Sequence, residues 1–139
     1  MVNSKPTETI QHNLSNTQMS YGEVVKKLDF IRTHDPEGAE RLKRLLDRKD
    51  TLSAGNVYGE RFTDRQFFLV FTPLLDAAFE RAKLLEALPE QGETIPVLSE
   101  RLGMGKERIF NHLKELIRKN LVEMAGHRDR DAIFRRKRI

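Results

Sequence analysis

Residues 93–124 read ETIPVLSERLGMGKERIFNHLKELIRKNLVEM, and this stretch decides the fold. Pro96 is typical of the first turn of a helix, and the apolar residues after it predict a helix that ends at Leu102. Gly103 can adopt the left-handed conformation that caps many helices at their C-terminal ends. A second helix is then expected over residues 106–119. The stretch therefore predicts a helix, a tight turn and a second helix.

The second predicted helix divides its side chains between two faces, at about 100° per residue. The apolar face consists of Ile109, Leu113, Leu116 and Ile117. The polar face consists of Glu107, Asn111, Lys114, Glu115 and Arg118. Phe110 and His112 lie at the two edges of the apolar face. We expect Phe110 to lie in the core, and His112 to serve in packing or in capping. One face therefore packs inward, and the other is free to enter a groove.

Three short strands are expected around these helices. One lies at 93–95, and residues 121–124 and 132–137 predict a hairpin closed by the turn AGHRDRD. Arg128 and Arg130 of this turn suit contacts with phosphate groups or with a minor groove. Two aspartates alternate with the arginines, so local neutralisation is the alternative interpretation.

Several positions in this region match one known pattern together. They are Leu98, Leu102, Gly103, Met104, Ile109, Asn111, His112, Leu113, Leu116, Asn120, Leu121, Val122, Gly126, Arg128 and Arg130. Through them, residues 78–137 resemble the DNA-binding core of winged helix-turn-helix repressors of the ArsR type. The resemblance implies a mainly α fold with a small β-hairpin wing. It also implies that the second helix enters the major groove, while the wing lies on phosphates or in the minor groove.

The sequence departs from that family in ways that bear on function. Thr94 and Pro96 stand where the family's thiolate metal sensor has cysteines, so metal sensing of that kind is excluded. Gly105 replaces the usual Ser or Thr N-cap, which removes a capping hydrogen bond. Glu107 and Glu115 place negative charge on the proposed reading face. The family's C-terminal dimer helix is not found after the wing, so we expect a dimer to form through the N-terminal helices.

The N-terminal part predicts an arm followed by a helical hairpin. Residues 1–20 are rich in Asn, Thr, Ser and Gln without a hydrophobic period, which indicates a flexible arm. Helical spacing over residues 21–34 predicts one helix. Asp35 followed by Pro36 predicts the N-cap and first turn of a second helix, which ends near Lys49.

The next segment predicts a loop and then a very apolar helix. Residues 51–62 carry turn residues and no period, which indicates a loop with at most one short strand. Thr63 and Gln66 match a capping box, and Pro73 either kinks the helix that follows or restarts it with Thr72 as N-cap. A helix that is apolar nearly all round is buried on several sides, and we expect a second copy of the chain to cover it. The residues expected in this dimer contact are Phe67, Phe68, Val70, Phe71, Leu74 and Leu75. We thus expect residues 21–72 to form a helical extension ahead of a winged helix-turn-helix domain at 73–139.

The composition excludes several classes of protein. No apolar stretch approaches the roughly 20 residues that span a bilayer, and the first 20 residues lack the apolar core of a secretory signal. We therefore expect a cytoplasmic protein without membrane contact. Cysteine is absent, and the histidines have no second ligand at metal spacing, so neither a metal nor a cofactor is expected.

The charge is distributed unevenly along the chain. Residues 100–139 contain 12 Lys and Arg against 6 Asp and Glu, whereas residues 1–99 contain 13 against 15, so their net charges are +6 and −2. Such asymmetry indicates a surface suited to an anionic polymer or an anionic membrane face.

These patterns favour a binding protein over an enzyme, because there is no nucleophile beside a base and no Gly-rich phosphate loop. We expect a sequence-specific transcriptional regulator that binds double-stranded DNA as a homodimer. The candidate DNA-contacting residues are Lys106, Arg108, Asn111, His112, Lys114, Arg118, Arg128 and Arg130. The alternative is a winged-helix protein-interaction module of a larger complex, without specific DNA binding.

Overall fold

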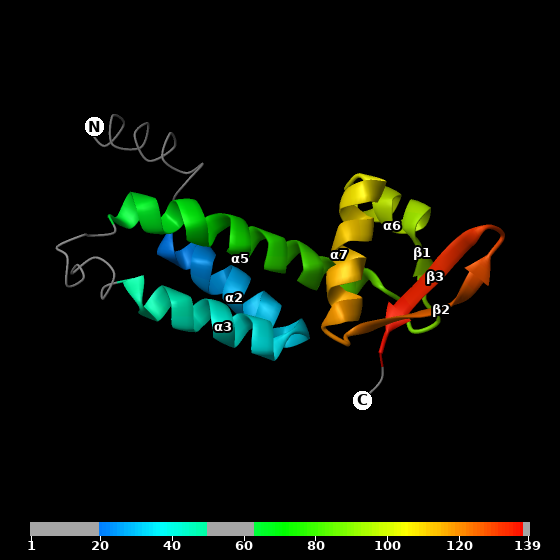
Figure 1. Ribbon diagram of the computed structural model, residues 1–139, viewed down its shortest axis with the longest axis horizontal. Coiled ribbons are helices and arrows are strands. Elements are labelled where there is room, and N and C mark those ends of the chain that lie inside the picture. Colours follow the sequence, from blue (N-terminus) through cyan, green and yellow to red (C-terminus); the bar gives the residue numbers. More distant parts are fainter. Residues whose placement is uncertain (1–19, 50–62, 138–139) are drawn as a thin grey trace. The chain divides into compact units, whose positions relative to one another are not determined.

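The computed structural model describes residues 20–49 and 63–137, which form five helices and three strands (Figure 1). In chain order the elements are α2 (Tyr21–His34), α3 (Pro36–Asp47), α5 (Asp64–Ala87), β1 (Glu93–Thr94), α6 (Ile95–Leu102), α7 (Lys106–Arg118), β2 (Val122–Arg128) and β3 (Asp131–Arg136). The chain divides into an N-terminal unit, Met1–Phe79, and a C-terminal unit, Glu80–Ile139, and α5 contributes to both. The expectation of a mainly helical chain with a small C-terminal β element is confirmed. Residues 1–19 of the predicted arm (1–20) and the predicted loop (51–62) lie outside the described residues.

In the N-terminal unit, α2 and α3 form the predicted hairpin (Figure 1). The carboxylate of Asp35 accepts a hydrogen bond from the backbone N–H of Gly38 at 3.1 Å, so Asp35 is the N-cap of α3, as expected. The start of α2 is fixed by a capping box that the prediction missed. Ser20 accepts from the N–H of Glu23, whose side chain in turn accepts from the N–H of Ser20, both at 3.2 Å. The sequence pattern S-x-x-E carries this signal.

Helix α5 begins after a capping box, as predicted. The hydroxyl of Thr63 accepts from the N–H of Gln66 at 3.1 Å, and the Gln66 side chain accepts from the N–H of Thr63 at 2.9 Å. Pro73 lies inside a continuous helix, so α5 does not restart at Thr72. Because Pro73 has no N–H, the carbonyl group of Leu69 loses its helical partner. Both residues are exposed, so solvent can replace that partner.

The chain itself covers much of the apolar face that a partner copy was expected to bury. Phe67, Phe68, Phe71 and Leu75 are at most 8% exposed within one chain, and neighbouring phenylalanine rings contact one another with centroids 5.2–6.0 Å apart. For these four residues, the expectation that a second copy of the chain covers them is therefore corrected, because the chain itself buries them. The part of this face that stays exposed consists of Leu69 (50%), Val70 (51%) and Leu74 (47%).

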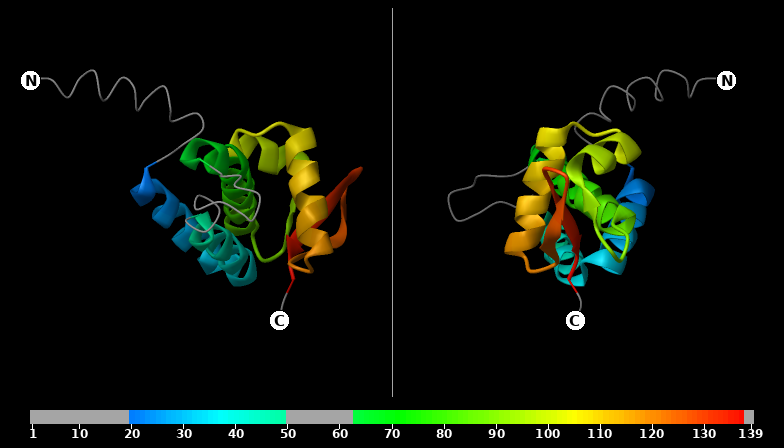
Figure 2. Two further views of the ribbon diagram at one scale, coloured as in Figure 1. Left: turned by 60° about the vertical axis from the view of Figure 1, so that its left-hand side comes forward. Right: turned by 90° about the vertical axis from the view of Figure 1, so that its right-hand side faces the viewer.

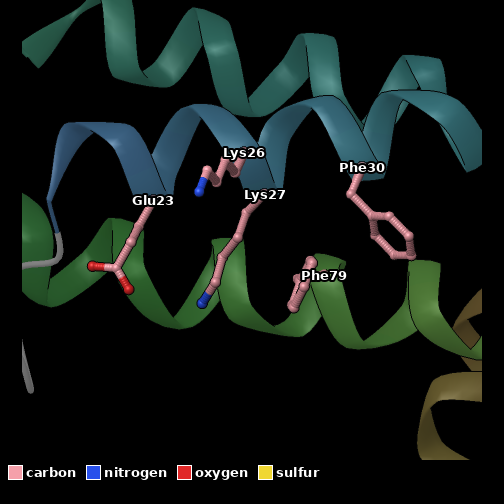
Figure 3. Close-up of a pocket in the computed structure, with 5 residues that line it drawn as sticks. All are labelled: Glu23, Lys26, Lys27, Phe30 and Phe79. Carbon is pink, nitrogen blue, oxygen red and sulfur yellow. The ribbon is translucent and has the colours of Figure 1, made fainter.

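Helices α2 and α5 also flank an open, mainly apolar hollow of about 360 Å³ in the N-terminal unit (Figure 3). Lys27 extends from α2 towards α5, where its Nζ atom lies 2.7 Å from Oδ1 of Asp76 and 5.1 Å from the ring centroid of Phe79. The ring of Phe30 contacts that of Phe79 edge to face, with centroids 5.3 Å apart. These contacts join α2 to the first part of α5.

The C-terminal unit packs a helix-turn-helix against a three-stranded antiparallel sheet of order β1-β3-β2. Its core residues come from every element of the unit except β1: Leu84, Leu85, Leu88, Leu98, Met104, Ile109, Leu113, Leu116, Val122 and Phe134. Gly92 allows the backbone just before β1 to pack closely against β3. Its φ is +95°, and an added Cβ would lie 2.5 Å from Cγ2 of Ile133 and 2.9 Å from the carbonyl oxygen of Phe134.

The β2–β3 hairpin is longer, and its turn shorter, than the sequence predicted. The strands continue to Arg128 and resume at Asp131, so the turn consists of two residues, Asp129 and Arg130, and Asp129 has a φ of +58°. Gly126, expected in the turn, lies in β2 at a bulge and has a φ of +139°. The cross-strand hydrogen bonds of the backbone thus continue through residues whose polarity indicated a loop. The hairpin projects from the helices of its unit (Figure 2).

Within residues 20–49 and 63–137, no helix combines the length and the apolar character of a membrane span. The same residues include no group of three or more His, Asp and Glu side chains that could hold a metal ion.

Candidate nucleic-acid interface

The turn between α6 and α7 has the predicted left-handed glycine. Gly103 has a φ of +68°, and the N–H groups of Gly103 and Met104 donate to the carbonyl of Ser99 at 2.9 and 3.2 Å. The Ser99 hydroxyl donates to the carbonyl of Met104. Among the described residues, no atom lies within 4 Å of a Cβ added at Gly103, so the backbone conformation, rather than crowding, favours glycine here.

Helix α7 begins without a side-chain cap, as the glycine at position 105 predicted. Gly105 is the N-cap, and within the described residues no side-chain capping hydrogen bond is formed there. The apolar stripe of α7 is nevertheless firmly packed. Ile109 and Leu113 are fully buried and Leu116 is 1% exposed, so this stripe fixes which side of the helix faces outward.

Two apolar residues of α7 lie outside the core, contrary to expectation. Phe110 is 45% exposed and Ile117 is 41% exposed. The core is centred on the line from Ile109 to Leu116, and an amphipathic helix buries a stripe about 100° wide. Phe110 and Ile117 lie about 100° and 80° from Ile109, at or beyond the edge of that stripe. Nζ of Lys114 lies 5.0 Å above the ring of Phe110.

Glu80, near the end of α5, joins two of the candidate residues of α7. Its carboxylate accepts from Nε of Arg108 at 2.9 Å and also from an Nη atom of that guanidinium. Nε2 of His112 lies 2.8 Å from Oε1 of Glu80. Burial acts to raise the pKa of Glu80, but the hydrogen bonds from His112 and Arg108 and the charge of Arg108 outweigh it, so the pKa is lowered on balance. His112 is only 9% exposed, so it supports α7 from inside rather than facing outward.

Glu93 of β1 joins the hairpin to α6 in a similar way. Its carboxylate lies 2.7 Å from Nη1 of Arg128, at the end of β2, and 3.7 Å from Nη2 of Arg101. The Glu93 residue is 8% exposed. Burial acts to raise its pKa, but the hydrogen bonds from Arg128 and from the N–H of Thr94, with the charges of Arg128 and Arg101, lower it on balance. Arg128 therefore pairs with Glu93, rather than with the aspartates beside it in the sequence.

Other basic residues of the C-terminal unit pair with carboxylates on the same helix or on the neighbouring strand. Arg118 donates to Glu115 of the same helix at 2.6 Å, and Arg135 donates to Glu123 across the hairpin at 2.8 Å. The Arg118 hydrogen bond is the main cause of a lowered pKa of Glu115. One of the two acidic residues expected to oppose DNA on α7 is thus neutralised locally.

A further set of polar side chains is exposed and uncommitted. In the described part of the C-terminal unit, the exposed side chains that form no hydrogen bond and no ion pair include Lys106, Asn111, Lys114, Arg130 and Arg136. The first four were predicted as DNA-contacting residues. Arg136 was not, although the basic run 135–138 carried a signal for it.

The candidate residues thus fall into three groups. Lys106, Asn111 and Lys114 face solvent from α7, and Arg130 faces solvent at the hairpin tip. Arg108, Arg118 and Arg128 are 59%, 77% and 50% exposed in their side chains but are paired with carboxylates. His112 is buried.

Comparisons of the chain with protein-family models, with curated proteins and with solved structures found no match.

Proposed function

We propose that this protein is a sequence-specific, DNA-binding transcriptional regulator, built as a winged helix-turn-helix with an N-terminal helical extension. The observation that carries the proposal is the outward face of α7. Three polar side chains of this face, those of Lys106, Asn111 and Lys114, form no hydrogen bond or ion pair within residues 20–49 and 63–137, while the opposite stripe is held in the core. A helix that follows a tight turn and presents such a face suits insertion into the major groove.

The proposed contacts divide by chemistry. The amide of Asn111 can donate to and accept from the edge of an adenine at once, which is a sequence-specific contact. Lys106, Lys114 and, at the hairpin tip, Arg130 supply charge for phosphates. Each of Arg108, Arg118 and Arg128 would have to leave its carboxylate partner in order to contact a phosphate. We therefore propose that these three arginines contribute less to the free energy of DNA binding. His112 is left out of the proposed interface, because its ring is buried against Glu80.

We propose that the regulator acts as a homodimer, in the cytoplasm. Two copies of a recognition helix read two half-sites, which raises both affinity and specificity. The exposed stripe of Leu69, Val70 and Leu74 on α5 supplies apolar surface for a second copy.

A second candidate function is a winged-helix module that binds another protein. It is favoured by one observation, the exposure of Phe110, Ile117 and Met124 at 45%, 41% and 56%. Exposed apolar side chains on neighbouring elements suit a protein partner at least as well as a polyanion.

Salt-dependent binding to a labelled DNA duplex separates these functions. Lys106, Lys114 and Arg130 of two copies would supply six phosphate contacts. Because each contact adds about 0.9 to the slope, a plot of log Kd against the logarithm of the salt concentration should have a slope of about 5. Lys114→Gln should reduce the slope, whereas Lys26→Gln, which removes an exposed lysine of α2, should leave it unchanged. A chain that binds no duplex at low salt would exclude DNA binding and leave the protein-interaction function.

A further inference from the structure

Phe110 is an exposed aromatic side chain at the border between the apolar stripe and the polar face of α7. It is the fifth residue of α7 and is followed directly by Asn111, whose side chain is uncommitted. Nearly half of Phe110 is open to solvent, although burial of such a side chain is worth about 1.5–3 kcal/mol. The fold of the C-terminal unit does not use this apolar surface, so it is available to a ligand.

We propose that Phe110 contacts the C5-methyl group of a thymine in the major groove, so that the recognised DNA contains an A·T pair beside the adenine that Asn111 contacts. This inference rests on the proposed function. In the major groove, the thymine methyl is the apolar group that the base edges present, and a phenylalanine is among the side chains that pack against it. Lys114, above the Phe110 ring, keeps its charge beside the same groove and can face a phosphate.

The position of Phe110 along α7 separates it from the other exposed apolar residue of the helix. In a helix-turn-helix, the N-terminal residues of the second helix lie nearest the base edges. Ile117 lies on nearly the same side of α7 but seven residues later, which is about 10 Å along the axis. Ile117 is equally exposed, so Ile117→Ala is a matched control for Phe110→Ala.

The experiment removes the methyl group and keeps every hydrogen bond of the base. Duplexes that the full chain prefers are first selected from a library with a randomised centre. Each thymine of a selected duplex is then replaced by deoxyuridine. Replacement at one or two positions should weaken the wild-type protein about fourfold for each methyl lost. Phe110→Ala should bind the two duplexes equally, while Ile117→Ala should discriminate as the wild type does.

Each other outcome overturns the inference. If the selected duplexes need no thymine, or if deoxyuridine weakens no complex, Phe110 contacts no methyl group, while DNA binding itself stands. If Phe110→Ala still discriminates, another residue makes the contact. If the chain binds no duplex at all, the proposed function fails and this inference fails with it. Equal melting temperatures of the three proteins verify that the substitutions at these exposed sites leave the fold intact.

Discussion

Replacing Glu80 with alanine is expected to loosen α7, because the carboxylate bonds two residues of that helix. The side chains of Glu80 and His112 are 19% and 11% exposed, whereas that of Arg108 is 59% exposed. Water can replace the partner of Arg108, so this loss is about 0.5 kcal/mol. A nearly buried ring nitrogen of His112 without a partner costs about 1–2 kcal/mol. The sum of about 2 kcal/mol corresponds to a fall in Tm of about 10 °C for a unit of this size.

Thermal unfolding of the full chain, together with hydrogen exchange at the amides of α7, measures this loss. Glu115→Ala is the matched control, because Glu115 also pairs with an arginine, Arg118, but at a site where that arginine is 77% exposed. The control should lose less than about 0.5 kcal/mol. Equal losses in the two variants would refute the reasoning that burial of His112 makes Glu80 a support of α7.

The same carboxylate gives a dependence on pH with a defined sign. The pKa of Glu80 in the folded chain lies below its ordinary value of 4.5, since the hydrogen bonds and charge described above outweigh burial. A carboxyl group with a lowered pKa stabilises the fold above its unfolded-state pKa, and this stabilisation disappears as the pH falls through the folded-state pKa. The stability difference between the wild type and Glu80→Gln should therefore be full at neutral pH and vanish in acid.

Four further outcomes are expected. Asn111→Ala should weaken binding to a selected duplex by about 1–3 kcal/mol and to random DNA much less; equal losses would show that Asn111 contacts no base. Arg130→Ala should lower the salt slope by about 0.9 per contact without loss of stability, whereas Arg128→Ala should lower stability, because it leaves a buried carboxylate without its nearest partner. Gly92→Ala should cost more than about 1 kcal/mol in denaturant unfolding, since its Cβ would lie 2.5 Å from a β3 side chain and its φ is +95°; wild-type stability would contradict this. Leu74→Lys should shift the sedimentation coefficient from that of a dimer to that of a monomer. A wild-type protein that sediments as a monomer would contradict the proposed dimer.

The parts of the fold that could be predicted are those set by neighbouring residues. A Gly at position 103, an Asp before Pro36 and a Thr three residues before Gln66 each determine a cap or turn through their own backbone and side chain. These signals were sufficient to place α3, the start of α5 and the helix-turn-helix, because their physics acts over one turn of helix.

The parts that could not be predicted depend on residues far apart in the sequence. Glu80 meets His112 across 32 residues, and Glu93 meets Arg128 across 35. No periodicity reports such pairs, since each acidic residue alone looks like an ordinary solvated charge. The exposure of Phe110 was missed for a related reason. Helical spacing gives the direction of a side chain, but the width of the stripe that is covered depends on what packs against it.

The bulge at Gly126 bears on how the protein behaves when many copies are concentrated. In the order β1-β3-β2, one edge of β2 has no neighbouring strand within the described sheet, and such an edge can template the addition of a strand from another molecule. The bulge interrupts the even spacing of backbone donors and acceptors along that edge, and charged side chains at Glu123 and Arg128 lie on either side of it. A foreign strand would therefore find only short stretches to pair with, which disfavours the addition of a strand from another molecule at this edge.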